Sequence, residues 1–257
     1  MEKRTFTQST RPCNAAFTQR TRLLMILKVL GSESAGNCYL IESDIECLII
    51  EAGIRLQEVK KALNYDLAKV IGCLISHSHG DHCRYARDYL KAGINIYTSD
   101  HTAITKEMIG HRIHIIKHYE VVTIGDFKVI PFPVPHGVPT LGFLIKHPAS
   151  GSILFVTDAA FIPHKFSNLS HILIEANYED AILTNDRAVG HHMSLDTCLE
   201  FLRVTDIKQI RNIVLLHLSN LNSDSNMFAK SIKSVAQNAS IWIADKGLEV
   251  NLSKYPF

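Results

Sequence analysis

The sequence lacks any apolar run long enough to cross a membrane. Of its 257 residues 46% are hydrophobic and 20% are charged, yet no segment reaches the about 18 consecutive apolar residues of a membrane helix. Internal repeats and low-complexity tracts are also missing. These absences argue against a membrane protein and a repeat array. The length is ample for one globular α/β domain.

Paired cysteines are also missing, although the chain has six cysteines. No two of them form a Cys-x-x-Cys pair, and no signal-peptide pattern opens the chain. A disulfide framework is therefore not expected, and we predict a cytoplasmic protein with reduced thiols. Cys47 and Cys73 lie inside apolar runs, as small hydrophobic residues do.

Acidic residues are scarce at the start of the chain. Residues 1–24 hold five basic side chains and only Glu2 as an acid, so they carry about +4, and the remainder carries about −2. We expect a basic, disordered extension over 1–24 and one folded domain over 25–257. Such a start also resembles an organelle transit peptide, and a start codon placed too early, before Met25, is a further alternative.

The densest group of reactive side chains follows a short apolar run. Residues 70–75 are branched and apolar, which predicts a buried strand. His77, His79, Asp81 and His82 then fall within six residues. Imidazoles bunched with a carboxylate are ligands that zinc prefers. A polar loop with chance histidines is the alternative, but the preceding strand favours a metal site. Cys83 abuts the group and is either a further ligand or a bystander.

Two more histidines and one aspartate each follow an apolar, strand-like run. His136 lies in PFPVPHGV, Asp158 in ILFVTDAA and His217 in IVLLHLS. The prolines around His136 stiffen its loop, which helps to place a ligand in advance.

The remaining pattern alternates between strands and helices, which is typical of α/β architecture. Helices are expected over 55–64, 84–91, 102–109, 194–204 and 224–236, with Asp100 as the cap of the third. Strands are expected over 25–30, 37–42, 47–51, 70–75, 94–97, 112–124, 127–134, 141–146, 152–157, 172–175, 212–216, 240–244 and 248–252. In the second helix, Arg84, Arg87 and Lys91 share one face. This face could hold a phosphate backbone, but we favour a solvated surface.

The sequence HSHGDH after a buried strand resembles the HxHxDH signature of the metallo-β-lactamase superfamily. That family continues with a later His, Asp and His at strand ends, which His136, Asp158 and His217 match in order. The resemblance implies a four-layer αββα sandwich.

The resemblance also implies two divalent metal ions, zinc first and manganese or iron as alternatives. His77, His79 and His136 would bind one ion, Asp81, His82 and His217 the other, and Asp158 would bridge them. Asp81 would also take part in catalysis. Family members usually carry Asp where Glu51 stands, with hydrogen bonds that steady the metal loop.

His192 begins HMSL, which is similar to the His-x-Ser/Thr motif of phosphodiesterases such as ribonuclease Z. There the histidine stabilises charge on the phosphate or acts as general acid. The alternative is a histidine at a helix start, with Ser194 as the cap; His191 is the adjacent competitor, but the spacing to the serine selects His192. Together with HLSNLNSD after His217, the motif looks closest to the exonuclease-like YycJ (WalJ) branch. Only 33 residues separate Asp158 from His192, too few for the inserted domain of β-CASP members.

The expected function is that of a dinuclear hydrolase whose metal-bound hydroxide attacks a phosphodiester of DNA or RNA. No nucleophilic triad is visible, and His79 stands where redox members carry Glu, which favours hydrolysis. The alternatives are a small-molecule hydrolase for a thioester, lactone or cyclic phosphate, and a non-catalytic binding module. The sequence leaves open the substrate, endo or exo action, the native metal and the oligomeric state.

Overall fold

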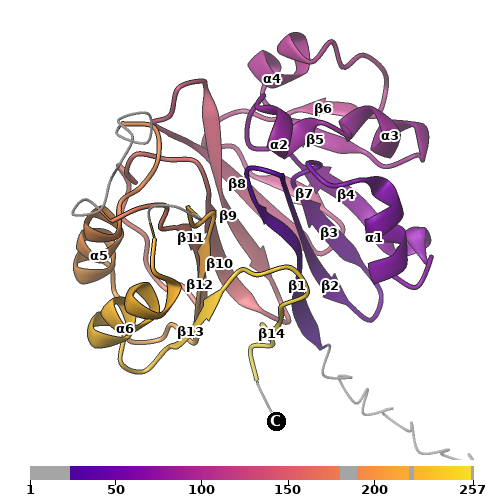
Figure 1. Ribbon diagram of the computed structural model, residues 1–257. Coiled ribbons are helices and arrows are strands. Elements are labelled where there is room, and N and C mark those ends of the chain that lie inside the picture. Colours follow the sequence, from indigo (N-terminus) through magenta and orange to yellow (C-terminus); the bar gives the residue numbers. More distant parts are fainter. Residues whose placement is uncertain (1–23, 180–189, 220–222, 256–257) are drawn as a thin grey trace, which may run out of the picture.

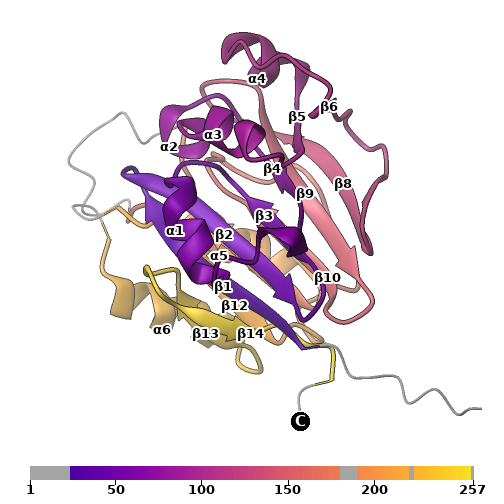
Figure 2. The same ribbon diagram turned by 90° about the vertical axis from the view of Figure 1, so that its right-hand side faces the viewer.

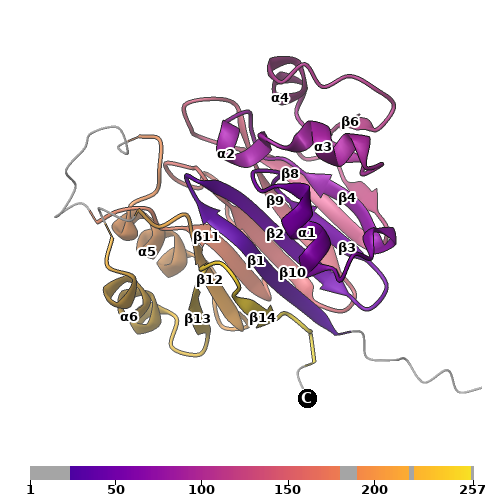
Figure 3. The ribbon, with the colours of Figure 1, turned by 45° about the vertical axis from the view of Figure 1, so that its right-hand side comes forward.

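Two β-sheets lie face to face in the computed structural model, with helices on both outer faces (Figures 1 and 3). The structure describes residues 24–179, 190–219 and 223–255. The prediction for the 1–24 extension therefore falls almost entirely outside the described residues. No helix within the described part of the chain is long and apolar enough to span a membrane.

Each sheet has seven strands. The first has the order β14 (Glu249–Asn251), β1 (Met25–Glu33), β2 (Gly36–Ser43), β3 (Cys47–Ile50), β4 (Val70–Leu74), β5 (Ile96–Thr98), β6 (Ile113–Ile115). The second has the order β13 (Ser240–Ile243), β12 (Asn212–Leu216), β11 (His171–Glu175), β10 (Gly151–Val156), β9 (Thr140–His147), β8 (Phe127–Val134), β7 (Val122–Ile124). Strands β3 to β6 run parallel, and so do β10 to β13.

Three separate apolar clusters define the four layers. Alternate residues of a strand face opposite sides of its sheet: in β12, Val214 and Leu216 join the cluster between the sheets. Ile213 and Leu215 instead pack toward the helices α5 (Leu195–Val204) and α6 (Ser225–Val235). The third cluster lies between the first sheet and the helices α1 (Leu56–Ala62) and α3 (Ala86–Lys91), which Figure 2 shows on that outer face. The predicted αββα sandwich is confirmed.

Two predicted elements differ from the structure. The run predicted as one strand over 112–124 is two strands in different sheets, because β6 pairs with β5 and β7 pairs with β8. Between them the chain turns at Tyr119, which has a φ of 66°. The predicted helix 84–91 corresponds to α3, which begins two residues later, at Ala86, with Tyr85 as its cap; a separate short helix, α2 (Gly80–Cys83), precedes it.

A third difference concerns the cap of α4 (Asp100–Thr105). The cap is Ser99, whose hydroxyl accepts a hydrogen bond from the Thr102 amide at 3.2 Å, and Asp100 is the first helical residue. At α5 the prediction is confirmed, since Ser194 accepts from the Thr197 amide at 3.2 Å.

The carboxyl ends of parallel strands meet at one edge of a sheet, and this edge carries the site. Strands β3 and β4 of the first sheet end next to Glu51 and His77. In the second sheet, β10 and β12 end next to Asp158 and His217, and Glu175 is the last residue of β11. The fold therefore gathers these side chains from both sheets.

A buried histidine ties the carboxyl terminus to the second sheet. His171 Nε2 donates to the Leu252 carbonyl at 2.9 Å, and the Asn212 amide donates to His171 Nδ1 at 3.0 Å. Burial and the nearby Arg211 guanidinium lower the pKa of His171 to about 3.

This pKa predicts acid sensitivity of the fold. An ordinary histidine titrates at about 6.5, so between that pH and about 3 the unfolded chain binds a proton that the folded chain does not. The free energy of unfolding should therefore fall with falling pH by about 1.4 kcal/mol per unit from this residue. His171→Gln should make the free energy of unfolding less dependent on pH. Urea unfolding of both proteins at pH 7 and pH 5 measures this. An identical pH dependence in both proteins would contradict the assignment.

Candidate metal centre

The candidate ligands converge in a buried cluster at the strand ends. His77 and His82 are fully buried, and Asp158 and His217 are only 2% and 5% exposed. Asp158 and His217 have φ values of 49° and 53°, in the left-handed region that costs a non-glycine residue about 1 to 3 kcal/mol. The tertiary structure therefore stabilises, at both residues, a backbone conformation that is locally unfavourable.

One set of donors consists of His77, His79, His136 and one oxygen of Asp158. His79 Nδ1 lies 3.2 Å from His136 Nε2. Asp158 Oδ2 lies 3.7 Å from both His77 Nε2 and His136 Nε2. Ligand atoms on a tetrahedral zinc, with bonds of about 2.0 to 2.2 Å, are about 3.3 to 3.6 Å apart, so the spacing fits a single small cation.

A second set consists of Asp81, His82, His217 and the other oxygen of Asp158. His82 Nε2 lies 3.1 Å from Asp81 Oδ2 and 3.3 Å from Asp158 Oδ1. His217 Nε2 lies 3.7 Å from Asp81 Oδ2. All seven predicted ligands are thus brought together, and the two oxygens of Asp158 face different sets, as expected of a bridging carboxylate.

Unpaired buried nitrogens support a cation at this place. His77 Nε2 and His217 Nε2 are buried without a hydrogen-bond partner, which is costly unless a ligand completes them. Burial lowers the pKa of His77 well below its usual value and so keeps the imidazole neutral, the form that binds metals. The donor set therefore fits a divalent ion.

Comparisons with known proteins agree with this geometry. Residues 48–218 match the family model described as beta-lactamase superfamily domain. The chain belongs to the metallo-β-lactamase superfamily. It is 24% identical over 245 residues to exodeoxyribonuclease YycJ of Bacillus anthracis, covering 84% of this chain and 91% of that protein.

Solved structures of the superfamily show the same fold. The crystal structure of the protein YhfI from Bacillus subtilis superposes with a TM-score of 0.72 at 17% identity, covering 89% of this chain and 99% of that one. Human tRNase Z, short form, gives a TM-score of 0.63 at 16% identity, covering 89% and 99%.

Glu51 replaces the aspartate usual in the superfamily and still reaches the metal-binding loop. Its carboxylate is fully buried and accepts a hydrogen bond from the Ser76 amide at 3.3 Å. Its Oε1 lies 3.5 Å from His82 Nδ1, the nitrogen that points away from the donor set. The longer side chain is thus placed to orient both the loop and one ligand.

Cys83 is outside both donor sets. Its thiol donates to the His79 carbonyl at 3.0 Å, and burial raises its pKa to about 11. A thiol must be deprotonated to bind metal, so the bystander interpretation is the one that the geometry supports.

Glu175 is a functional candidate that the sequence analysis missed. It is fully buried, and its Oε1 accepts from His192 Nδ1 at 2.7 Å and lies 3.3 Å from His217 Nδ1. Burial alone would raise the pKa of Glu175, but these hydrogen bonds outweigh it and the pKa lies below its usual value. The available signal was its position at the end of the apolar run HILIE, like the other site residues.

His192 faces the cluster, as predicted; the His191 ring lies 6.0 Å from that of His136, centroid to centroid. The His192 ring lies 5.4 Å from that of His136 and stacks on that of His217 at 5.3 Å, centroid to centroid. His191 contributes its carbonyl, which accepts from His136 Nδ1 at 2.6 Å. Since Glu175 engages Nδ1 of His192, Nε2 is the nitrogen left for a substrate.

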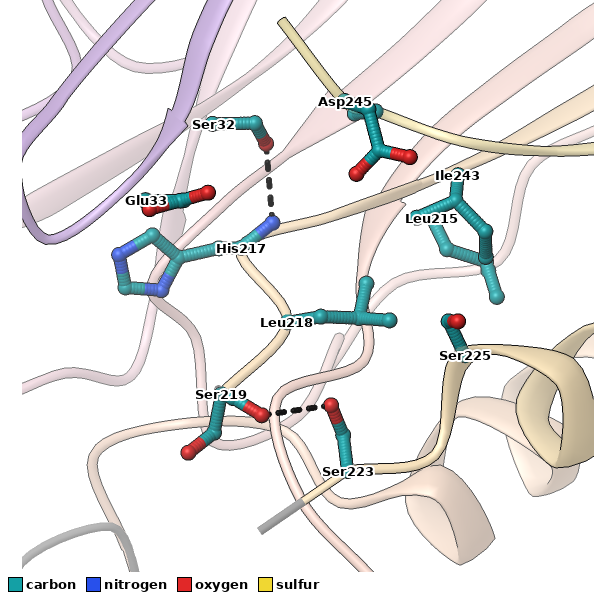
Figure 4. Close-up of a pocket in the computed structure, with 11 residues that line it drawn as sticks. Ser32, Glu33, Leu215, His217, Leu218, Ser219, Ser223, Ser225, Ile243 and Asp245 are labelled. Atoms are coloured by element: carbon teal, nitrogen blue, oxygen red, sulfur yellow. Dashed lines mark hydrogen bonds between the residues drawn. The ribbon is translucent and has the colours of Figure 1, made fainter. Parts of the chain in front are cut away.

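A polar cavity of about 190 Å³ adjoins His217 (Figure 4). Its acidic side chains are Glu33 and Asp245, and Ser32, whose hydroxyl accepts from the His217 amide at 3.0 Å, lies at its wall. None of the described residues that line it is a lysine or an arginine. The cavity therefore disfavours an anion.

The bridging geometry of Asp158 leads to a test by metal content. Wild-type protein should hold close to two zinc, manganese or iron ions per chain. Asp158→Asn should lose most of both, because the amide replaces one carboxylate oxygen by NH2 and removes the negative charge that the two donor sets share. Elemental analysis after purification without chelator measures this.

Asp126→Asn is the control. Asp126, Glu46 and His147 form a separate acid–histidine group, but Glu46 already accepts from the Asp126 amide and from His147 Nε2. This variant should keep the metal content of the wild type. A single ion per wild-type chain, with no gain on reconstitution, would contradict the two-ion arrangement.

Proposed function

We propose that the protein is a metal-dependent phosphodiesterase that cleaves nucleic acid, DNA or RNA. The observation that carries the proposal is the placement of His192, a residue that is not in either donor set but faces both. The similarity to proteins named exodeoxyribonuclease YycJ and tRNase Z supports the same substrate class.

Two divalent ions at the donor sets would supply an activated water and stabilise charge on the phosphate. Burial alone would lower the pKa of His192, but the hydrogen bond and charge of Glu175 raise it above its usual value. This environment favours the protonated ring, and its Nε2 would give a proton to the leaving oxygen. Glu175 holds the ring in place.

Asp81 has a different role from His192 in the proposed reaction. Its side chain is 19% exposed, against 3% for Asp158, so it is the carboxylate that solvent reaches. It would accept a hydrogen bond from the attacking water and so orient it toward the phosphate.

A hydrolase for a small molecule, such as a thioester, lactone or cyclic phosphate, is the second candidate. The observation in its favour is the modest volume of the cavity beside His217, about 190 Å³, which suits a compact substrate. A non-catalytic binding module is disfavoured by the complete set of donors.

We infer a cytoplasmic location from the absence of disulfide bonds among the described cysteines. The five cysteines in the described part of the chain are all free and buried.

His192→Ala tests the phosphodiesterase assignment. The variant should keep both metals while its turnover of a single-stranded oligonucleotide drops by about 10²-fold or more, the scale of a lost general acid. The loss should be smaller for bis-p-nitrophenyl phosphate, whose leaving group needs little protonation. Steady-state rates on both substrates, with elemental analysis, measure this.

The neighbouring His191→Ala is the matched control. It removes another imidazole beside His136, with ring centroids 6.0 Å apart, but keeps the carbonyl that accepts from His136 Nδ1. Full nuclease activity in His192→Ala would remove the main support of the proposal. Wild-type protein that hydrolyses thioesters or lactones and no diester would favour the second candidate.

We also propose that residues 25–257 form the hydrolase domain by themselves and that the +4 segment before them assists binding. Deleting residues 2–24 should leave metal content and turnover of bis-p-nitrophenyl phosphate unchanged. Oligonucleotide binding should weaken, and less so at high salt. Loss of small-diester activity would show that the segment is part of the catalytic fold.

A further inference from the structure

Basic side chains cluster on one side of the metal centre, in a hollow between α2, α3 and the end of α4. The hollow has a volume of about 410 Å³. Arg84, Arg87 and Lys106 line it, with Glu107 as the acid among its lining residues. This is a local excess of positive charge on a domain whose net charge is about −2.

Arg84 places its charge directly on the metal-binding loop. Its guanidinium folds over Gly80, where an added Cβ would lie 3.8 Å from a guanidinium nitrogen. Gly80 stands between two predicted ligands, His79 and Asp81. The guanidinium of Arg84 and the ammonium of Lys106 make no hydrogen bond or ion pair within the described ranges, so their charges are available to a ligand.

Arg87 is held differently. Its guanidinium pairs with Glu107 at 3.1 Å and donates to the Lys106 carbonyl at 3.2 Å. These contacts tie α3 to the end of α4 and close the hollow on that side. The sequence suggested a basic helix face of Arg84, Arg87 and Lys91, but Arg84 precedes α3, at the end of α2. Lys91 does not line the hollow and Lys106 does.

The other flank of the centre has the opposite charge. The hollow is lined by segments that follow β4 and β5 in the chain. The cavity of Glu33 and Asp245 is instead lined by residues at the ends of β1 and β12 (Figure 4), and β1 is separated from β4 by two strands of the first sheet. A polyanion bound across the metals is attracted toward the first flank and repelled from the second.

We propose that the hollow binds a backbone phosphate of a nucleic-acid strand, one that neighbours the phosphate at the metals. Arg84 supplies a planar fork suited to two phosphate oxygens, and Lys106 supplies a point charge. Such contacts fix the register of the strand without reading its sequence. The strand therefore leaves the metals toward α4, and its end lies toward the acidic cavity. This inference rests on the proposed function for the identity of the bound strand as substrate.

Binding measurements with charge variants test the hollow. The probe is a fluorescent single-stranded oligodeoxynucleotide with phosphorothioate linkages, which resist cleavage, and the protein is metal-loaded and full-length. Arg84→Ala and Lys106→Ala should each weaken binding roughly three- to tenfold and reduce the slope of log Kd against log salt by about 0.7 to 1. Arg84→Lys should recover part of the loss.

Two further variants sharpen the test. Glu107→Gln releases Arg87 from its ion pair, so it should tighten binding and steepen the salt dependence, the opposite of the other changes. Lys91→Ala is the matched control, because it removes a cation from α3 that does not line the hollow; its Kd should equal that of the wild type. If all five variants bind as the wild type does, or if Lys91→Ala weakens binding as much as Arg84→Ala does, the hollow is not the phosphate site.

Wild-type turnover of bis-p-nitrophenyl phosphate separates this inference from the proposed function. If wild-type protein binds the oligonucleotide through Arg84 and Lys106 but hydrolyses no diester, the hollow is a nucleic-acid site and the phosphodiesterase proposal fails. If it hydrolyses diesters while the Arg84 and Lys106 variants bind the oligonucleotide normally, the phosphodiesterase proposal stands and the proposed phosphate site in the hollow is wrong.

Discussion

The structure of the site depends on one buried carboxylate, Asp158, that lies between histidines of two donor sets. Its two oxygens are 3.7 Å from His77 Nε2 and 3.3 Å from His82 Nε2. A buried carboxylate is costly unless positive charge compensates it. Burial alone would lower the pKa of His217, but the Asp158 charge raises it to about 10, and metal ions at the donor sets would supply that compensation instead. The donors come from strand ends of both sheets, so ions held here would join the two halves of the sandwich, and metal affinity would add to the stability of the fold.

The same constraint explains the surrounding residues. Each ligand needs its other polar atom engaged, and Glu175 and the His191 carbonyl do this for His217 and His136. Glu51 lies 3.5 Å from His82 Nδ1. Glu175 also holds His192, which joins the metal centre to the group proposed to protonate the leaving oxygen. Arg84 and Lys106 place positive charge on one flank of the metal centre, and Glu33 and Asp245 place negative charge on the other. This asymmetry would orient a bound polyanion toward Arg84 and Lys106.

How far the sequence predicts the site depends on how local each signal is. His77, His79, Asp81 and His82 are close in the chain and follow a buried strand, so spacing marks them as candidate ligands. His136, Asp158 and His217 were predicted through the resemblance to the metallo-β-lactamase pattern. Glu175 sits at a strand end without a characteristic spacing, and Lys106 and Arg84 line the same hollow only because of the tertiary fold. The strand predicted over 112–124 failed for a related reason: hydrophobic pattern does not show to which sheet a segment belongs.

The most direct test of the account is anomalous diffraction from crystals of the metal-loaded protein. The account predicts two peaks about 3.5 to 4 Å apart, each bound by one of the two donor sets, with one oxygen of Asp158 on each ion. A single peak, or a pair of ions held by Glu175 and His192 in place of Asp81 and His82, would contradict it.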